Sequence, residues 1–198
     1  MKKNILIITI SSILLSCGTP TVPEQPETGI VYDYTGSNNS NIKKGLLGNK
    51  RTKIQSVKLG KLSISSDGTK SILGIPFFKQ GKDNTCGQAT MTSILNFWGI
   101  KADYQTIVNE TNSSNIGTDL NVITDYVKKQ GLDATAYNNG TMEELKYLID
   151  QSRPPIVLLD FGSLSKEHYV IVSGYNDEQK VFLINDTVQG ANIKVSYS

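Results

Sequence analysis

The sequence predicts an α+β domain in which helices come first and an antiparallel sheet follows. Residues 86–151 contain segments with helical periodicity, bounded by capping residues and glycines. Residues 154–198 contain four short runs of β-branched and aromatic residues separated by turn formers. With 198 residues, 38% of them hydrophobic, the chain is long enough for one domain with a real core. Helices followed by strands favour the α+β arrangement.

Residues 1–16 have the composition of an export signal rather than of a folded element. Two lysines precede the apolar run "ILIITI", and small residues follow it. The run is short for a transmembrane helix. "LLSC", residues 14–17, resembles the lipobox of bacterial lipoprotein precursors, in which the cysteine is acylated and becomes the mature N-terminus. We therefore expect a signal peptide over 1–16 and lipidation of Cys17; a simple cleaved signal and an uncleaved anchor are the alternatives.

Residues 17–40 are expected to form a flexible stalk, because they are rich in Pro, Thr, Glu, Gly, Ser and Asn. Removal of residues 1–16 would leave 18 basic and 18 acidic residues. This balance argues neither for nor against nucleic acid, and "GLLGNKR" lacks the spacing of a phosphate-binding loop. The partners we expect are a peptide or protein substrate and, through the lipid on Cys17, a membrane, and no nucleic acid. The oligomeric state is not predicted.

Residues 41–71 carry eight basic residues and one acid, Asp67. The alternation in "KIQSVKLGKLSIS" is consistent with one or two strands that lead into the domain. The alternative interpretations are a pro-segment that covers the active site and a contact with anionic lipid or cell-wall polymer.

Three segments are predicted to be helical. The first starts at Cys86, with Asn84 or Thr85 as its cap and Gly99 as its stop. The second has Thr118 as its expected cap and Gly131 as its stop. The third opens with a capping box formed by Thr141 and Glu144. The inward faces are expected to hold Cys86, Ala89, Ile94, Phe97 and Trp98 in the first helix, and Leu120, Ile123 and Val127 in the second.

The four strand runs are "PPIVLLDF", "HYVIVSGY", "KVFLINDT" and "NIKVSYS". "YNDEQK", residues 175–180, is a plausible hairpin loop between the second and third runs. Those two runs are therefore expected to be antiparallel neighbours.

Cys86 is the candidate nucleophile. A helix N-terminus lowers the pKa of a thiol, and the backbone amides there can hold an oxyanion. The chain contains one histidine, so a base for Cys86 has to be His168. Asp186, at the end of the next strand, can orient that imidazole, whereas alternation directs Asn185 to the other face. With so few histidines and cysteines, a zinc site is not expected.

Gln80 precedes the cysteine by six residues, and its carboxamide can donate to an oxyanion. The segment "IPFFKQGKDNTCGQATMTSILNFWGI" resembles the opening motif of the bacteriocin-processing, or double-glycine, cysteine peptidases, called family C thirty-nine. The similarity continues through "GTDLNVITDYVKKQGLDATAY", "EELKYLIDQSRPPIVLL", "HYVIVSGYN" and "VFLINDT", from Ile75 to Asp186. In that family proline usually follows the aspartate, where this chain has Thr187.

This resemblance implies a papain-like fold over residues 72–198, with no cofactor. It implies Cys86 as nucleophile, His168 as general base, Asp186 as the residue that orients it, and Gln80 in the oxyanion hole. The expected activity is peptide-bond hydrolysis through a thioester. Two alternatives stay open: an acyltransferase or amidase that uses the same residues, and a papain-like module that binds a peptide without cutting it.

Overall fold

A computed structural model describes residues 6–12, 60–81, 84–111, 117–160 and 167–197 of the chain. The four helices are α1 (Cys86–Phe97), α2 (Tyr104–Thr111), α3 (Leu120–Lys129) and α4 (Met142–Asp150). The strands are β1 (Leu6–Ser12), β2 (Lys61–Ile64), β3 (Lys70–Leu73), β4 (Leu132–Tyr137), β5 (Ile156–Asp160), β6 (Glu167–Asn176), β7 (Val181–Asp186) and β8 (Gly190–Ser196). Within the described residues no helix is both long enough and apolar enough to cross a bilayer.

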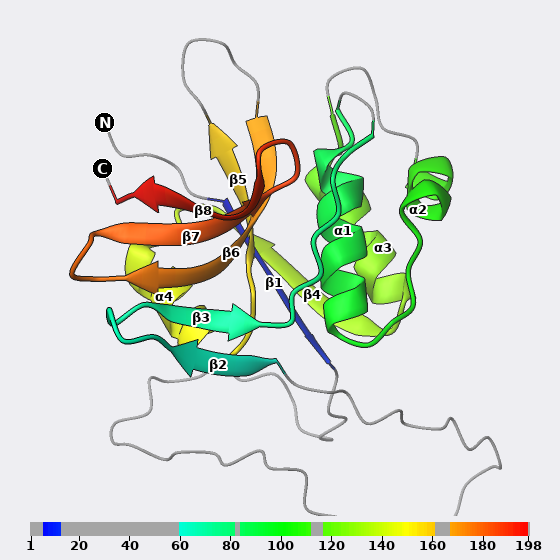
Figure 1. The fold of residues 1–198 in the computed structure, drawn as a ribbon. Helices are drawn as coiled ribbons and strands as arrows, with labels where there is room; N and C mark the ends of the chain where they lie inside the picture. The colour runs from blue at the N-terminus through cyan, green and yellow to red at the C-terminus, as the bar shows by residue number, and fades with distance from the viewer. Residues whose placement is uncertain (1–5, 13–59, 82–83, 112–116, 161–166, 198) are drawn as a thin grey trace, which may run out of the picture. The chain divides into compact units, whose positions relative to one another are not determined.

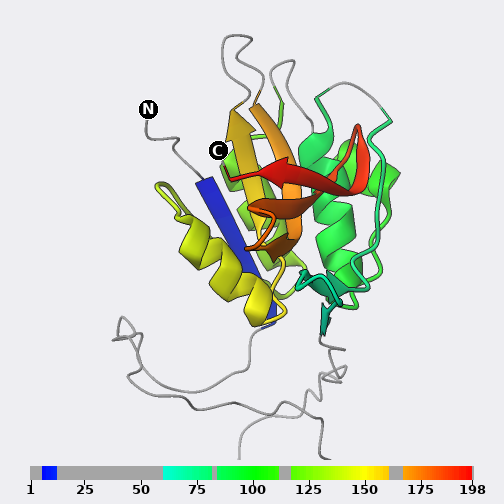
Figure 2. The ribbon, with the colours of Figure 1, turned by 60° about the vertical axis from the view of Figure 1, so that its left-hand side comes forward.

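The strands form one sheet in the order β2-β3-β6-β5-β1-β4. Strands β3 and β5 pair with different stretches of β6. Strand β7 also pairs with β6, and β8 pairs with β7. Every pair of neighbours is antiparallel. Helices α1 to α3 are grouped on one side in Figure 1, away from β7 and β8. Figures 1 and 2 both place β1, β5 and β6 between α1 and α4. The predicted α+β class, in which helices pack on an antiparallel sheet, is confirmed.

Helix α1 is the central helix of the domain. Eleven of its twelve residues are buried, including the polar Gln88, Thr90 and Thr92. The hydroxyls of Thr92 and Ser93 donate to backbone carbonyls four residues earlier, at 2.8 and 3.1 Å. These bonds satisfy polar groups that would otherwise be costly to bury.

The three predicted helices, α1, α3 and α4, are present and differ from the prediction only at two caps, whereas α2 was not predicted. Thr85 is the N-cap residue of α1 but makes no side-chain cap, and Asp119 rather than Thr118 caps α3 by accepting from the backbone of Asn121. Thr118 instead donates to the buried side chain of Gln88, at 2.8 Å. The capping box at the start of α4 is confirmed. Gly99 and Gly131, which follow α1 and α3, have the positive φ of helix-terminating glycines, 81° and 85°.

Strand β1 comes from the segment that we expected to be a signal peptide outside the fold. It lies between β4 and β5 and is antiparallel to both. Ile7, Ile8 and Ile10 are 0%, 0% and 1% exposed. A short, continuous apolar run is typical both of a strand buried on two faces and of the apolar core of a signal peptide. The sequence alone therefore does not distinguish the two.

Strands β2 (Lys61–Ile64) and β3 (Lys70–Leu73) belong to the sheet, so the folded unit begins before residue 72. Strands β2 and β3 form a hairpin, and β3 pairs with β6 through Lys70 and Ser71. The buried amide of Asn176 donates to the carbonyl of Asp67 at 2.8 Å and to the hydroxyl of Thr69 at 2.9 Å. These bonds fix the hairpin turn to β6. Residues 41–59 of the basic segment lie outside the described residues, and so do Cys17 and the stalk at 17–40.

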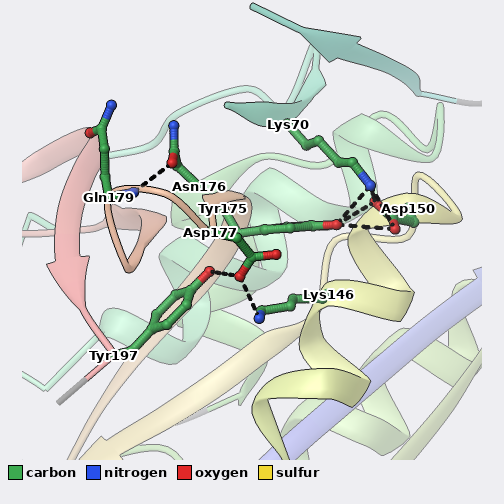
Figure 3. Close-up of polar contacts among 8 residues, drawn as sticks. All are labelled: Lys70, Lys146, Asp150, Tyr175, Asn176, Asp177, Gln179 and Tyr197. Carbon is green, nitrogen blue, oxygen red and sulfur yellow. Dashed lines mark hydrogen bonds and ion pairs between the residues drawn. The ribbon is translucent and has the colours of Figure 1, made fainter. Parts of the chain in front are cut away.

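A polar network fastens α4 to the sheet, as Figure 3 shows. Lys70 forms an ion pair with Asp150 at 3.0 Å and donates to the hydroxyl of Tyr175 at 2.8 Å. The Tyr175 hydroxyl also donates to Asp150, at 3.0 Å. Lys146 pairs with Asp177 at 2.6 Å, and that carboxylate also accepts from Tyr197. Because these charges are partnered within the fold, we assign the network a structural role.

Candidate active site

Cys86 is the first residue of α1 and is 6% exposed. The preceding Thr85 directs its hydroxyl to that of Tyr104, at 2.8 Å, instead of capping the helix. Asn84, the other expected cap, has a left-handed φ of 64°. The thiol therefore lies at the positive end of a buried helix, as predicted.

His168 and Asp186 lie on neighbouring strands, as the hairpin prediction required. His168 is the second residue of β6, and Asp186 is the last residue of β7. Nε2 of His168 is 3.1 Å from Oδ1 of Asp186. Asn185 points elsewhere and accepts from the backbone N–H of Asn192 at 3.0 Å. The choice of Asp186 over Asn185 as the partner of His168 therefore agrees with the geometry.

The carboxylate of Asp186 is 2% exposed and held by several donors. Oδ1 accepts from the backbone N–H groups of Val188 at 2.8 Å and Gln189 at 3.0 Å, and Oδ2 accepts from the Gln189 side chain at 3.1 Å. Burial raises the pKa of this carboxyl, but the backbone donors and His168 outweigh it and lower the pKa below its ordinary value. A charged, immobile carboxylate is what an orienting group for histidine requires.

Cys86 and His168 shift each other's pKa in opposite directions. Burial raises the pKa of the thiol, but the hydrogen bond to His168, backbone donors of Tyr169 and Gly87, and the charge of His168 bring it below its ordinary value. Burial lowers the pKa of His168, but Cys86 and Asp186 raise it above its ordinary value. Since Nε2 faces Asp186, Nδ1 is the ring nitrogen left for the thiol. This pattern favours a thiolate–imidazolium pair.

Gln80 lies in the loop after β3 and is attached to the end of β7. Its backbone N–H donates to the carbonyl of Thr187 at 3.0 Å. The hydroxyl of Thr187 donates to Oε1 of Gln80 at 2.8 Å. Thr187 directly follows Asp186, so the structure attaches Gln80 beside the carboxylate that holds His168.

Three further residues shape this site, and no local pattern in the sequence indicates them. Tyr104, at the start of α2, accepts from the backbone N–H of Gly81 at 2.9 Å and also bonds Thr85. Thr187 holds Gln80. Gly87 packs so closely that an added Cβ would lie 2.7 Å from Cβ of Thr118. Each contact joins segments far apart along the chain, and local patterns do not report such pairs.

No group of three or more residues that could hold a metal ion occurs in the described part of the chain. The chemistry that the described site supports is nucleophilic attack by a thiolate with a histidine as acid and base, since these are the groups brought together.

A helix carrying a cysteine at its N-terminus, packed against an antiparallel sheet that supplies a histidine and an aspartate, defines a papain-like domain. The Peptidase_C39 like family model matches residues 72–197, and the chain belongs to this family. At the level of the family it is a papain-like peptidase domain. No match was found among curated proteins.

Two solved structures share the fold. One is a double glycine motif protease from an AMS/PCAT transporter in complex with the leader peptide, with 21% identity, TM-score 0.51, and coverage of 62% of this chain and 80% of that one. The other is the peptidase domain of Streptococcus ComA, a bi-functional ABC transporter involved in a quorum-sensing pathway. It shows 20% identity, TM-score 0.52, and coverage of 62% of this chain and 87% of that one.

Proposed function

We propose that the protein is an exported, lipid-anchored cysteine peptidase. The observation that carries this proposal is that His168 contacts Asp186 at 3.1 Å and also hydrogen-bonds Cys86, so that the pKa of the thiol is lowered and that of the imidazole is raised. A buried structural cysteine would have its pKa raised by the same burial.

In the proposed reaction, the thiolate of Cys86 attacks the carbonyl carbon of a peptide bond, and the carbonyl oxygen becomes an oxyanion. The carboxamide of Gln80 and backbone N–H groups at the start of α1 stabilise that charge. The imidazolium of His168 donates its proton to the leaving amine, which leaves a thioester. His168 then takes a proton from water as the water attacks the thioester, and the acid is released with the thiolate restored.

The expected substrate is a peptide. One structural neighbour was solved in complex with a leader peptide, and we extend peptide binding to this chain as part of the proposal. If an amine replaced water in the second step, the same residues would catalyse acyl transfer.

The direct test incubates the full chain with a mixture of random peptides and identifies products by mass spectrometry. Using the Cys17→Ser background leaves Cys86 as the single thiol, because the chain has two cysteines. New termini with wild-type Cys86 and none with Cys86→Ala would support hydrolysis, and joined peptides would indicate acyl transfer. Peptide binding without any product would contradict the peptidase proposal and favour a binding module.

Export rests on the composition of residues 1–16 and on the "LLSC" sequence before Cys17. In this proposal residues 1–16 are removed, and β1 with them. Because β1 is antiparallel to both β4 and β5, those two strands run in the same direction and are connected through α4. Such strands can pair directly as a βαβ unit once β1 has left. Labelled palmitate should enter the wild-type protein in bacterial cells, and Cys17→Ser should abolish the labelling.

A further inference from the structure

Thr187 contacts Gln80 through both its backbone and its side chain. Its carbonyl accepts from the backbone N–H of Gln80 at 3.0 Å, and its hydroxyl donates to Oε1 at 2.8 Å. Thr187 is 2% exposed, so solvent does not compete for this hydroxyl. The residue also follows Asp186 directly, and its position is therefore fixed by the same strand end that holds His168.

A carboxamide has two chemically opposite ends, and only its NH₂ end can stabilise an oxyanion. In this structure the Thr187 hydroxyl donates to Oε1 at 2.8 Å, so the oxygen end of the Gln80 carboxamide faces Thr187 and the NH₂ end lies on the opposite side of the group. In the reverse orientation, the hydroxyl would face the NH₂ end, and Oε1 would take the place of the donor. A carbonyl oxygen in that place would repel a developing negative charge instead of stabilising it.

We propose that Thr187 is a positioning residue whose hydroxyl fixes the Gln80 carboxamide so that Nε2 serves as the oxyanion donor. The inference rests on the proposed function and adds a residue to it. Tyr104 assists, because its hydroxyl accepts from the backbone N–H of Gly81 and fixes the chain next to Gln80.

Loss of this orientation should slow only those reactions of Cys86 that form an oxyanion. Acylation of Cys86 by p-nitrophenyl acetate passes through a tetrahedral oxyanion. Alkylation by iodoacetamide displaces iodide and forms none, so it reports only on the thiolate and on His168. Loss of one oxyanion donor lowers kcat by about 10²–10³-fold in a well-studied protease. Loss of the donor's orientation should lower kcat by a smaller factor.

The test uses the full chain in the Cys17→Ser background, with the variants Thr187→Val, Thr187→Ser and Gln80→Ala. Thr187→Val is expected to slow acylation by about 10-fold or more through kcat rather than KM. Thr187→Ser should restore the rate, since it keeps the hydroxyl. The pH profile of iodoacetamide alkylation should be the same in all four proteins.

A double variant decides whether Thr187 acts through Gln80. If it does, Thr187→Val should cost nothing further in the Gln80→Ala background. Three results would overturn the inference and leave the peptidase proposal intact. They are a wild-type acylation rate in Thr187→Val, a double variant in which Thr187→Val slows acylation as much as it does in the wild type, and a shifted pH profile of alkylation. A wild-type protein that is not acylated, and whose Cys86 alkylates like an ordinary thiol, would overturn both.

Discussion

Nε2 of His168 lies 3.1 Å from Oδ1 of Asp186, although the two residues are 18 positions apart. The β6–β7 hairpin produces this contact, since Val170 is the Cα partner of Asp186 and His168 lies two residues earlier on the same strand. Residues two apart on a strand lie on the same face. The pairing of the strands therefore places the imidazole and the carboxylate on one face, at the end of the hairpin away from its turn.

Asp186→Asn should weaken the pair without disrupting the turn. Oδ1 still accepts from the backbone N–H groups of Val188 and Gln189, whereas the negative charge that raises the pKa of His168 is lost. The pKa of His168 should fall and that of Cys86 should rise, measured by alkylation of Cys86 against pH. Asp186→Ala is the matched control: it also removes the acceptor, so its unfolding free energy should drop by about 1–3 kcal/mol more than that of the Asn variant. Equal stability of the two variants would contradict this account of the turn.

Peptide hydrolysis should have a bell-shaped pH dependence. The acid limb follows Cys86, whose pKa is lowered, so activity is lost only as the pH falls through that lowered value. The alkaline limb follows His168, whose pKa is raised, so the acid for the leaving amine persists above its ordinary range and is lost as the pH rises through the raised value. Measurement of kcat/KM across the pH range tests this, and a single rise near the pKa of a free thiol, about 8.5, would be inconsistent with it.

Gly87→Ala should destabilise the start of α1. The added Cβ would lie 2.7 Å from Cβ of Thr118, closer than van der Waals contact allows. Overpacking of this kind costs about 1–3 kcal/mol, which urea unfolding can measure. Gly81→Ala is the control, because its Cβ would meet Tyr104 at an ordinary 3.5 Å. If both variants were equally stable, the close approach of Gly87 to Thr118 would be refuted.

Ile8→Asp should strongly destabilise the full chain. Ile8 is 0% exposed in β1, where a charged side chain has no access to water. Burial of one isoleucine contributes about 1.5–3 kcal/mol, and burial of the charge adds a further penalty. Thermal unfolding of the wild-type full chain, of Ile8→Asp and of a chain that starts at residue 17 gives the comparison. Identical melting of the wild type and Ile8→Asp would show that β1 does not contribute to the folded state.

Much of the fold could be predicted because its signals are local. The capping box of Thr141 and Glu144 and the stop glycines at 99 and 131 each depend on neighbouring residues. Three elements were not predicted: α2 buries only Ile107, β1 has the same composition as a signal core, and β4 is a six-residue strand outside the predicted strand runs. The cap of α3 was placed one residue early, because Thr118 and Asp119 are both good caps and packing against Gln88 decides between them.

The candidate site likewise contains some features that local sequence signals predict and others that depend on long-range contacts. Cys86 at a helix start, and the choice of Asp186 over Asn185, follow from helix polarity and strand alternation. The attachment of Gln80 to Thr187 could not be predicted, because it joins residues 107 apart through a loop that folds back beside β7. The role of Tyr104 depends on a similar long-range contact.

The central claim is that Cys86 and His168 form a reactive ion pair. Its most direct test is the alkylation rate of Cys86 by iodoacetamide as a function of pH, in the full chain with Cys17→Ser, compared with the same chain carrying His168→Ala. We predict that the first protein stays reactive well below pH ~8.5, where an ordinary thiol titrates, and that His168→Ala loses this low-pH reactivity. Identical profiles with the titration of a free cysteine, or a thiol that reacts only after unfolding, would contradict the account.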